Sequence, residues 1–309
     1  MMGTESAPAD QSTDSCRRRL LLLRGRFVMD IQLGSERIFV LEEREGVDAL
    51  RQRAMDRRTQ SFGGGIGGLL QRPKAEDVVL VASQRRLEPF WHVSGRAHYV
   101  YERSRDYAVP ASASEVREVT IVGTTYPVAE SGPTARTFTV SATEHCREEI
   151  AHELDADART GAKVADAAAV LAGPRQEVND PATLAVNETI VVPPEHRASF
   201  VVRQLLSEML KPVQADRVIE ESLTLETIDL CYRPIWAFEF HWQSKDKRGV
   251  VEIDAATGVI RQGGSLMPQF SKMVTRDALF DIGADTIGLL VPGGSIAVKV
   301  ARAALDKSY

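Results

Sequence analysis

The chain has 309 residues, of which 43% are hydrophobic and 26% charged, and its formal net charge is -5. That length supports a large buried core, and the composition excludes collagen-like, disulfide-stapled and wholly disordered proteins. The acidic balance disfavours nucleic acid as a partner, because a general nucleic-acid binder needs a basic face. The three cysteines, Cys16, Cys146 and Cys231, lie far apart and form no CxxC motif, which indicates a reducing, cytoplasmic environment.

The first half of the chain predicts a disordered leader followed by an α+β module. Residues 1–15 are small and polar, which is typical of a disordered leader. Two apolar runs, RFVMDIQL and ERIFVLEE, predict a hairpin around Gly34-Ser35, although the second run also fits the start of a helix. Residues 46–58 predict a charged helix, and alternating aromatic runs predict strands between 77 and 143. These segments make up a first module over residues 16–143.

The second half predicts a connector, a second module and a tail. Residues 144–192 predict an acidic helical connector, in which Gly173-Pro174 ends the helical stretch. Residues 193–266 predict a second α+β module, in which a helix is followed by the strands SLTLETIDLCY, IWAFEFHWQS and GVVEIDAATGVIR. Residues 267–309 predict a C-terminal helical tail. The helix after Pro193-Pro194 has one apolar stripe, formed by Ala198, Val201, Val202, Leu205 and Met209.

The two β-rich regions share a pattern that suggests an internal duplication. Glu76-x-Val78-x-Leu80 precedes Pro89-Phe90-Trp91 in the first region, and Glu226-x-Ile228-x-Leu230 precedes Pro234-Ile235-Trp236 in the second. A helical stretch lies before each region, so an α-β-β-β unit used twice accounts for the spacing. A chance similarity between two antiparallel sheets is the alternative. Both interpretations give an α+β protein with helices on one face of antiparallel sheet.

The second module carries a helix at 195–210, the aromatic strand Trp236-Ala237-Phe238-Glu239-Phe240 and the turn Asp254-Ala255-Ala256-Thr257-Gly258. In such a turn Asp caps its own backbone and Gly adopts a positive φ. With these features, residues 193–266 resemble a PepSY-like domain, a small helix-plus-antiparallel-sheet module associated with the regulation of peptidases. The resemblance implies a binding or regulatory module without catalytic residues.

One cluster combines residue types that bind transition metals. His145, Glu149 and His152 fall at i, i+4 and i+7, so a helix would place them on one face. Cys146 would lie beside this face, at the position after His145. These side chains suit zinc, and the cluster suggests a metal-dependent hydrolase. The alternative is a solvated helix surface, because the spacing is not that of HExxH. No other cofactor is expected.

Other signs of chemistry are weaker, and no catalytic residue is assigned. Gly63-x-Gly65-x-x-Gly68 matches the dinucleotide fingerprint only formally, because Pro73 and a strand follow it, and we interpret it as a flexible joint. A nucleophile pair of Cys231 and His241 is conceivable. Cys231 lies in an apolar strand, however, which is typical of an inert buried thiol.

The sequence favours a non-enzymatic adaptor or regulatory protein that binds another protein. The candidate contact residues are Trp91, Trp236, Trp242, Leu289 and Leu290. For the tryptophans the alternative is a core role, since alternation along 236–242 places Trp236, Phe238, Phe240 and Trp242 on one face. The apolar stretch of the tail is too short to span a bilayer, and attachment to a membrane surface through this tail is a further alternative.

Overall fold

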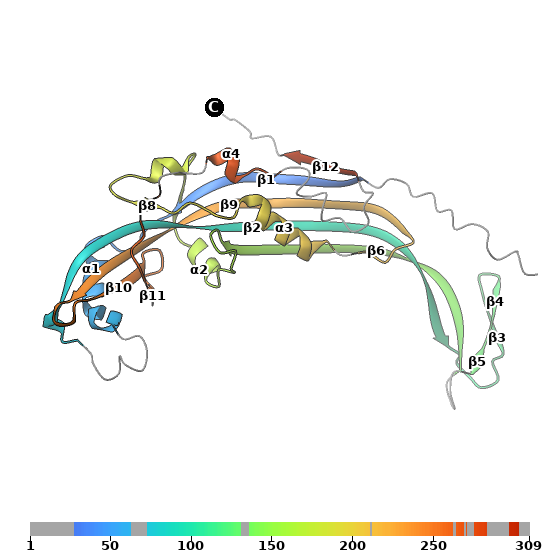
Figure 1. The fold of residues 1–309 in the computed structure, drawn as a ribbon. Helices are drawn as coiled ribbons and strands as arrows, with labels where there is room; N and C mark the ends of the chain where they lie inside the picture. Colours follow the sequence, from blue (N-terminus) through green and yellow to red (C-terminus); the bar gives the residue numbers. More distant parts are fainter. Residues whose placement is uncertain are drawn as a thin grey trace, which may run out of the picture.

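A computed structural model describes residues 28–62, 73–130, 136–210, 212–261, 264–268, 270, 275–282 and 297–302. Ten of the described strands form one mixed sheet. Its long members are β1 (Val28–Leu41), β2 (Val78–Pro110), β6 (Arg136–Asp157) and β9 (Arg217–Trp242). These strands run side by side along an arch (Figure 1).

Strand β9 is the centre of the sheet because it has neighbours on both edges. One edge pairs antiparallel with β2. The other edge is shared: β1 runs parallel to its first half, as far as Tyr232, and β10 (Lys247–Asp254) runs antiparallel to its second half from Ile235. Pro234 lies where one partner gives way to the other, a position that tolerates a residue without a backbone N–H.

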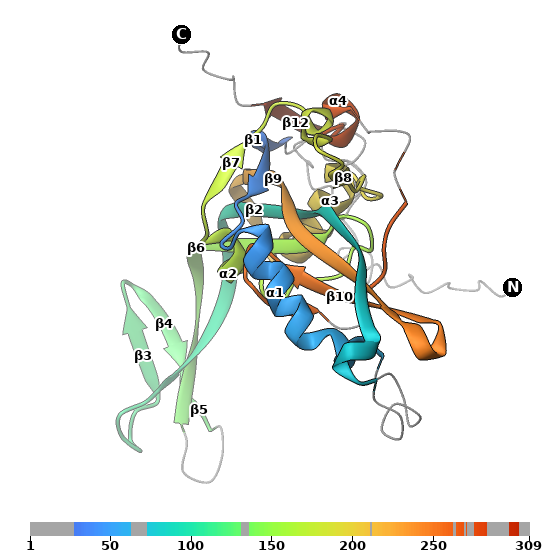
Figure 2. The same cartoon turned by 90° about the vertical axis from the view of Figure 1, so that its left-hand side faces the viewer.

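The far edge of β2 pairs with β6 from Phe90 to Pro110, and this two-stranded ribbon extends to one end of the arch. A small hairpin of β3 (Glu118–Ile121) and β4 (Thr124–Pro127) lies there, and β5 (Ala129–Glu130) pairs with β6 beside it. Figure 2 looks along the arch from the opposite end, so that the hairpin is faint in the distance. The remaining short strands extend the sheet edges: β7 (Arg175–Glu177), β8 (Ile190–Val191), β11 (Ile260–Arg261) and β12 (Ala297–Arg302).

Helix α3 (Ala198–Met209) covers one side of the sheet, which we call the α3 face. The predicted stripe of this helix is confirmed, because all five of its residues are fully buried in the main core. On the sheet side of that core lie Trp91, Leu154 and Leu230. Since β-strands alternate, the odd residues of β2 around Trp91 and the even residues of β6 around Leu154 point to this face.

Two further helices cover other parts of the sheet. Helix α1 (Val47–Arg57) is the predicted charged helix, and its Leu50 packs with Phe238, Phe240 and Trp242 at one end of the arch. Helix α2 (Ala167–Leu171) packs on the opposite side from α3, which we call the α2 face, against Phe39, Phe90 and Cys231. Short helical turns complete the described chain: η1 (Arg58–Phe62), η3 (Ala75–Asp77), η4 (Pro181–Leu184), η5 (Gln243–Lys245) and α4 (Arg276–Leu279).

The predicted fold class of two helix-plus-sheet modules with a helical tail is wrong. A single sheet runs through both predicted modules, and the two similar sequence segments belong to neighbouring antiparallel strands, with Trp91 opposite Leu230. The described part of the predicted tail holds only the short α4 and a strand, β12, which pairs in parallel with β1. The two segments that suggested a duplication therefore lie on two long neighbouring strands of one sheet.

Two local predictions are also wrong. The predicted helical connector 144–192 begins as strand, because β6 continues to Asp157 along β2. The predicted hairpin at Gly34-Ser35 is a continuous β1, which pairs with β9 on both sides of these residues. Three predictions lie outside the described residues: the leader 1–15, the glycine-rich joint at Gly63–Gly68 and the contact residues Leu289 and Leu290.

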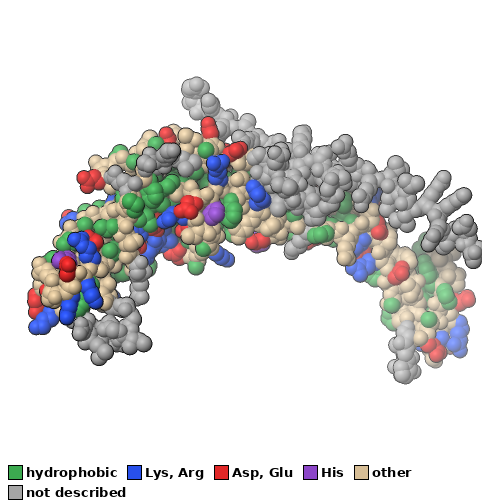
Figure 3. All heavy atoms as spheres, viewed as in Figure 1, with side chains coloured by type: hydrophobic (Ala, Val, Ile, Leu, Met, Phe, Trp, Pro, Cys, Tyr) green, Lys and Arg blue, Asp and Glu red, His purple; other side chains and the backbone are tan. Residues whose placement is uncertain are grey.

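The Asp254-to-Gly258 turn is confirmed in its details. Asp254 Oδ1 accepts hydrogen bonds from the backbone N–H groups of Ala256 (2.9 Å) and Thr257 (3.1 Å), and Gly258 has a φ of 78°. Elsewhere the surface is of mixed charge: on the face in Figure 3, basic and acidic side chains are interspersed. Across the described ranges, the helices all fall short of the length and hydropathy that a transmembrane span requires.

Candidate functional site

The predicted metal cluster is wrong, because a strand cannot align its residues. Along β6, His145 and Glu149 point to the α2 face, whereas Cys146 and His152 point to the α3 face. His145 Nδ1 lies 3.1 Å from Glu102 Oε1, and His152 Nε2 lies 3.4 Å from Glu208 Oε2 on α3. The two histidines therefore have separate partners on opposite sides of the sheet.

The core alternative is confirmed for Trp91 and Trp242, which are buried, whereas a partner-binding role stays a prediction for Trp236, which is only partly buried. Trp91 is fully buried and donates its indole N–H to the His196 carbonyl (2.8 Å). Trp242 is 7% exposed and donates to Asp77 Oδ2 (2.7 Å). Trp236 is half-buried, stacks on Phe238 and donates to Glu43.

The candidate nucleophile pair does not form. Cys231 and His241 lie ten residues apart on the same strand, which corresponds to roughly 33 Å. Cys231 is fully buried, and this burial raises the pKa of its thiol to about 12. The thiol therefore stays protonated and unreactive, as its apolar strand predicted.

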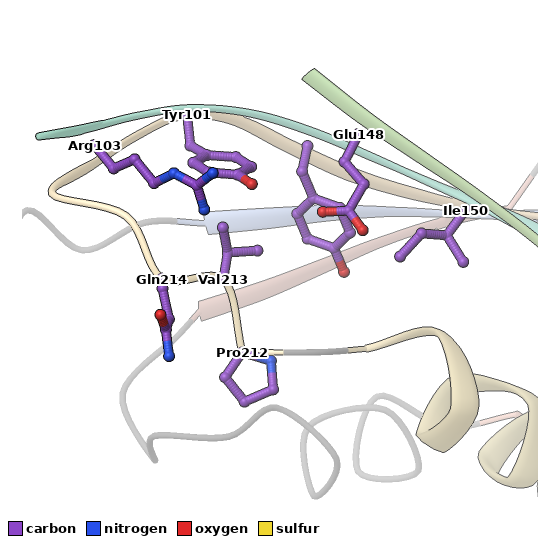
Figure 4. A pocket seen from close by; sticks show the side chains of 8 residues that line it. Tyr101, Arg103, Glu148, Ile150, Pro212, Val213 and Gln214 are labelled. Atoms are coloured by element: carbon purple, nitrogen blue, oxygen red, sulfur yellow. The ribbon is translucent and has the colours of Figure 1, made fainter. Parts of the chain in front are cut away.

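A pocket of about 230 Å³ opens on the α3 face, between the sheet and the segment after α3. We call it the tyrosine pocket; its lining residues are Tyr99, Tyr101, Arg103, Glu148, Ile150, Pro212, Val213 and Gln214. Figure 4 shows Tyr101, Glu148 and Ile150 on the sheet side, and Pro212, Val213 and Gln214 across from them. The alternation of β2 brings Tyr99, Tyr101 and Arg103 to the same face.

Tyr99 pairs with a glutamate on each of its two neighbouring strands. Tyr99 on β2 lies opposite Glu148 of β6 on one side and Glu221 of β9 on the other. Within the described ranges, the side chains of Glu148 and Glu221 form no hydrogen bond or ion pair. The Tyr99 side chain is 2% exposed, and its hydroxyl has no partner among the described residues. Burial, with smaller effects of the Glu221 and Glu148 charges, raises the pKa of Tyr99 to about 12.

The positive charge of Arg103 does not compensate these two carboxylates, because it has its own partner. Its guanidinium forms an ion pair with Glu144, which also accepts a hydrogen bond from Tyr107. These hydrogen bonds, first that of Tyr107 and then that of Arg103, lower the pKa of Glu144. Among the residues that line the pocket, Glu148 therefore contributes a negative charge that no described cation compensates.

Replacing Glu221 with glutamine is expected to stabilise the protein at neutral pH by about 1 kcal/mol. Burial raises the pKa of Glu221, so folding disfavours its charged form. A carboxyl with a raised folded-state pKa costs stability above that pKa, and the cost disappears as pH falls below the ordinary value of 4.5. Urea unfolding of both proteins between about pH 4.5 and 8 measures the difference. Equal stabilities at pH 8, or a gain also in Glu220→Gln on the opposite face, would contradict the expectation.

A second group of polar side chains lies on the α2 face. His92 of β2 lies opposite Asp155 of β6, with Nδ1 2.8 Å from Asp155 Oδ1 and 3.6 Å from Glu153 Oε1. The hydrogen bond to Asp155 raises the pKa of His92 despite partial burial. On its other side His92 lies opposite Asp229, a fully buried residue whose carboxylate accepts two hydrogen bonds of 3.0 Å from Arg37.

Sequence reasoning missed both groups, although part of the signal was present. The run His98-Tyr99-Val100-Tyr101 alternates, which predicts two tyrosines on one face of a strand. In comparisons with protein-family models, with curated proteins and with solved structures, nothing matches this chain.

Proposed function

We propose that this protein is a non-catalytic binding protein whose tyrosine pocket receives a basic side chain of a partner protein. One observation carries the proposal: Glu148, whose carboxylate has no described counterion, lines the same pocket as Tyr99, its cross-strand partner, and the buried Tyr99 hydroxyl has no described hydrogen-bond partner. Buried polar groups generally have hydrogen-bond partners. A ligand that donates several hydrogen bonds would supply them here.

A lysine side chain fits this chemistry. Its ammonium group has three donors and no acceptor, so it can donate to the Glu148 carboxylate and, once the side chains that cover the Tyr99 oxygen move aside, to that oxygen as well. The raised pKa of Tyr99 keeps the phenol neutral, so its oxygen can accept a hydrogen bond without carrying a negative charge. Ile150, Pro212 and Val213 offer an apolar wall for the methylene groups of the stem.

The size of the pocket favours a partner protein over a free metabolite. At about 230 Å³ it is smaller than the roughly 300–1,000 Å³ of sites that enclose a drug-sized ligand. A single side chain presented by a larger partner suits such a volume. The net charge of -5 would also attract a basic partner. A cytoplasmic location is part of the same proposal, supported by the three widely spaced cysteines.

The test is a titration of the full chain with a blocked Gly-Gly-Lys-Gly-Gly peptide, followed by the NMR signals of ¹³C-labelled tyrosine rings. We expect the peptide to shift the signals of Tyr99 and Tyr101. In Glu148→Gln the affinity is expected to fall by roughly 10- to 150-fold, because a hydrogen bond to a charged group contributes about 1.5–3 kcal/mol.

Two controls make this test specific. A peptide with norleucine in place of lysine keeps the apolar stem without the charge, and it is expected to cause no shifts. Glu149→Gln removes the neighbouring carboxylate, which points to the opposite face, and it should bind like the natural chain. Equal binding of the norleucine peptide, or full binding by Glu148→Gln, would refute the proposal.

A further inference from the structure

The three polar side chains on the α2 face, His92, Glu153 and Asp155, are arranged as metal ligands. One ligand atom from each lies within 4.8 Å of the others. Glu153 and Asp155 are two residues apart on β6, so they point to the same face, and His92 lies opposite Asp155 on β2. Two ligands on alternate residues of one strand, with a third on its neighbour, converge on one point above the sheet.

The separations between these atoms suit a small transition ion. An ion that binds nitrogen and oxygen at about 2.0–2.2 Å in tetrahedral geometry needs ligand atoms roughly 3.3 Å apart. His92 Nδ1 lies 2.8 Å from Asp155 Oδ1 and 3.6 Å from Glu153 Oε1, on either side of that value. Only small side-chain adjustments are therefore required to bind an ion.

The charge at this point also matches a divalent cation. Asp155 and Glu153 contribute two negative charges, while neutral His92 supplies nitrogen. Asp229, which lies opposite His92 on β9, is already held by Arg37, and Arg175 Nη1 lies 4.0 Å from its carboxylate. Asp229 is therefore compensated within the protein, whereas the side chains of Glu153 and Asp155 have only the His92 imidazole as a partner in the part of the chain that the structure describes.

We propose that His92, Glu153 and Asp155 bind a divalent first-row transition ion such as Zn²⁺, independently of the tyrosine pocket on the other face. One imidazole with two carboxylates favours such ions over Mg²⁺ and Ca²⁺, which prefer all-oxygen sites. Asp155 and His92 are about 15% and 16% exposed in their side chains, while Glu153 is 57% exposed. The ion would thus be bound by side chains of the sheet on its inner side, and its outer side would remain accessible to water.

Calorimetric titration of the full chain with Zn²⁺, after removal of metal with a chelator, tests the proposal. We expect one ion per chain, no comparable binding of Mg²⁺, and a visible absorption band when Co²⁺ is added instead. Loss of a group that only supports a metal ligand lowers metal affinity roughly 10–100-fold. His92 is proposed as a ligand itself, so His92→Ala is expected to lower the affinity by more than this. Glu153→Gln alters an exposed side chain, so it should weaken binding without affecting the fold.

The matched control is His98→Ala. His98 lies on the same strand and face as His92 and also has two carboxylates nearby. These carboxylates belong to different strands and face different ring nitrogens: Glu149 of β6 lies 3.6 Å from Nδ1, and Glu220 of β9 lies 3.9 Å from Nε2. This variant should bind one Zn²⁺ normally. Absence of stoichiometric binding in the natural chain would overturn the proposal. So would binding that survives both His92→Ala and Glu153→Gln in proteins with unchanged thermal unfolding.

Discussion

Replacing Asp254 with alanine is expected to lower the free energy of unfolding by about 3–5 kcal/mol, the cost of leaving a buried ionic partner uncompensated. Asp254 is fully buried at the end of β10. One carboxylate oxygen caps the turn to Gly258, and the other forms an ion pair with Arg233, which is itself only 7% exposed. The substitution therefore removes a turn cap and a buried counterion together.

The effect of this substitution should spread because Asp254 joins a longer series of ion pairs. Acidic and basic side chains alternate across the α2 face in the order Asp166, Arg233, Asp254, Arg261, Glu88, Arg86 and Glu252. Arg86, between the last two carboxylates of this series, is 3% exposed and lies 2.7 Å from both Glu88 and Glu252. This series ties β2, β9, β10 and β11 together where β9 changes partners.

Urea unfolding of Asp254→Ala beside Asp166→Ala distinguishes a buried ionic role from a general charge effect. Asp166 also pairs with Arg233, at 2.5 Å, but its side chain is 47% exposed. Removing it is expected to cost about 1 kcal/mol or less, as for other pairs open to solvent. Equal losses in the two variants would show that burial of Asp254 does not set the energy.

The parts of the fold that sequence reasoning predicted are those whose pattern is local. Helix α3 places its whole stripe in the core, and the alternation of Trp236, Phe238, Phe240 and Trp242 gives one packed face, because periodicity directly reports which side is buried. The turn at Asp254 was predictable for the same reason. In each case the residues that determine the structure are neighbours in sequence.

Strand β6 was missed because its local composition favours helix. Its acidic residues and alanines are good helix formers, and they adopt a strand only because β2 pairs with the whole segment. A signal of period two was present nonetheless: Ile150, Leu154 and Ala156 are apolar and point to the α3 face. The candidate sites required still more, because Tyr99, Glu148 and Glu221 meet only through the register of three strands.

Gly34→Ala is the second substitution with a large expected effect, and it tests why β1 does not turn. The sequence predicts a turn at Gly34, but the glycine serves close packing instead. β1 runs parallel to β9 through this point, and Leu33 and Ser35 lie opposite Leu225 and Thr227. A methyl group at Gly34 would lie 2.4 Å from the carbonyl oxygen of Glu226 and 2.5 Å from that of Leu225.

Because these contacts are with backbone, no side-chain rotation can relieve them, and β1 would have to move away from β9. We expect a loss of about 3 kcal/mol, the upper end of the range for overpacked positions, measured as the free energy of unfolding in urea.

Gly46→Ala is the matched control. Its new methyl group would meet nothing within 4 Å, and the extended backbone (φ -67°, ψ 156°) accepts alanine. The control should cost about 1 kcal/mol or less, as for a changed helix cap. If Gly34→Ala proves as mild as this control, β1 cannot pair with β9 in the register described, because that register leaves no room for the methyl group.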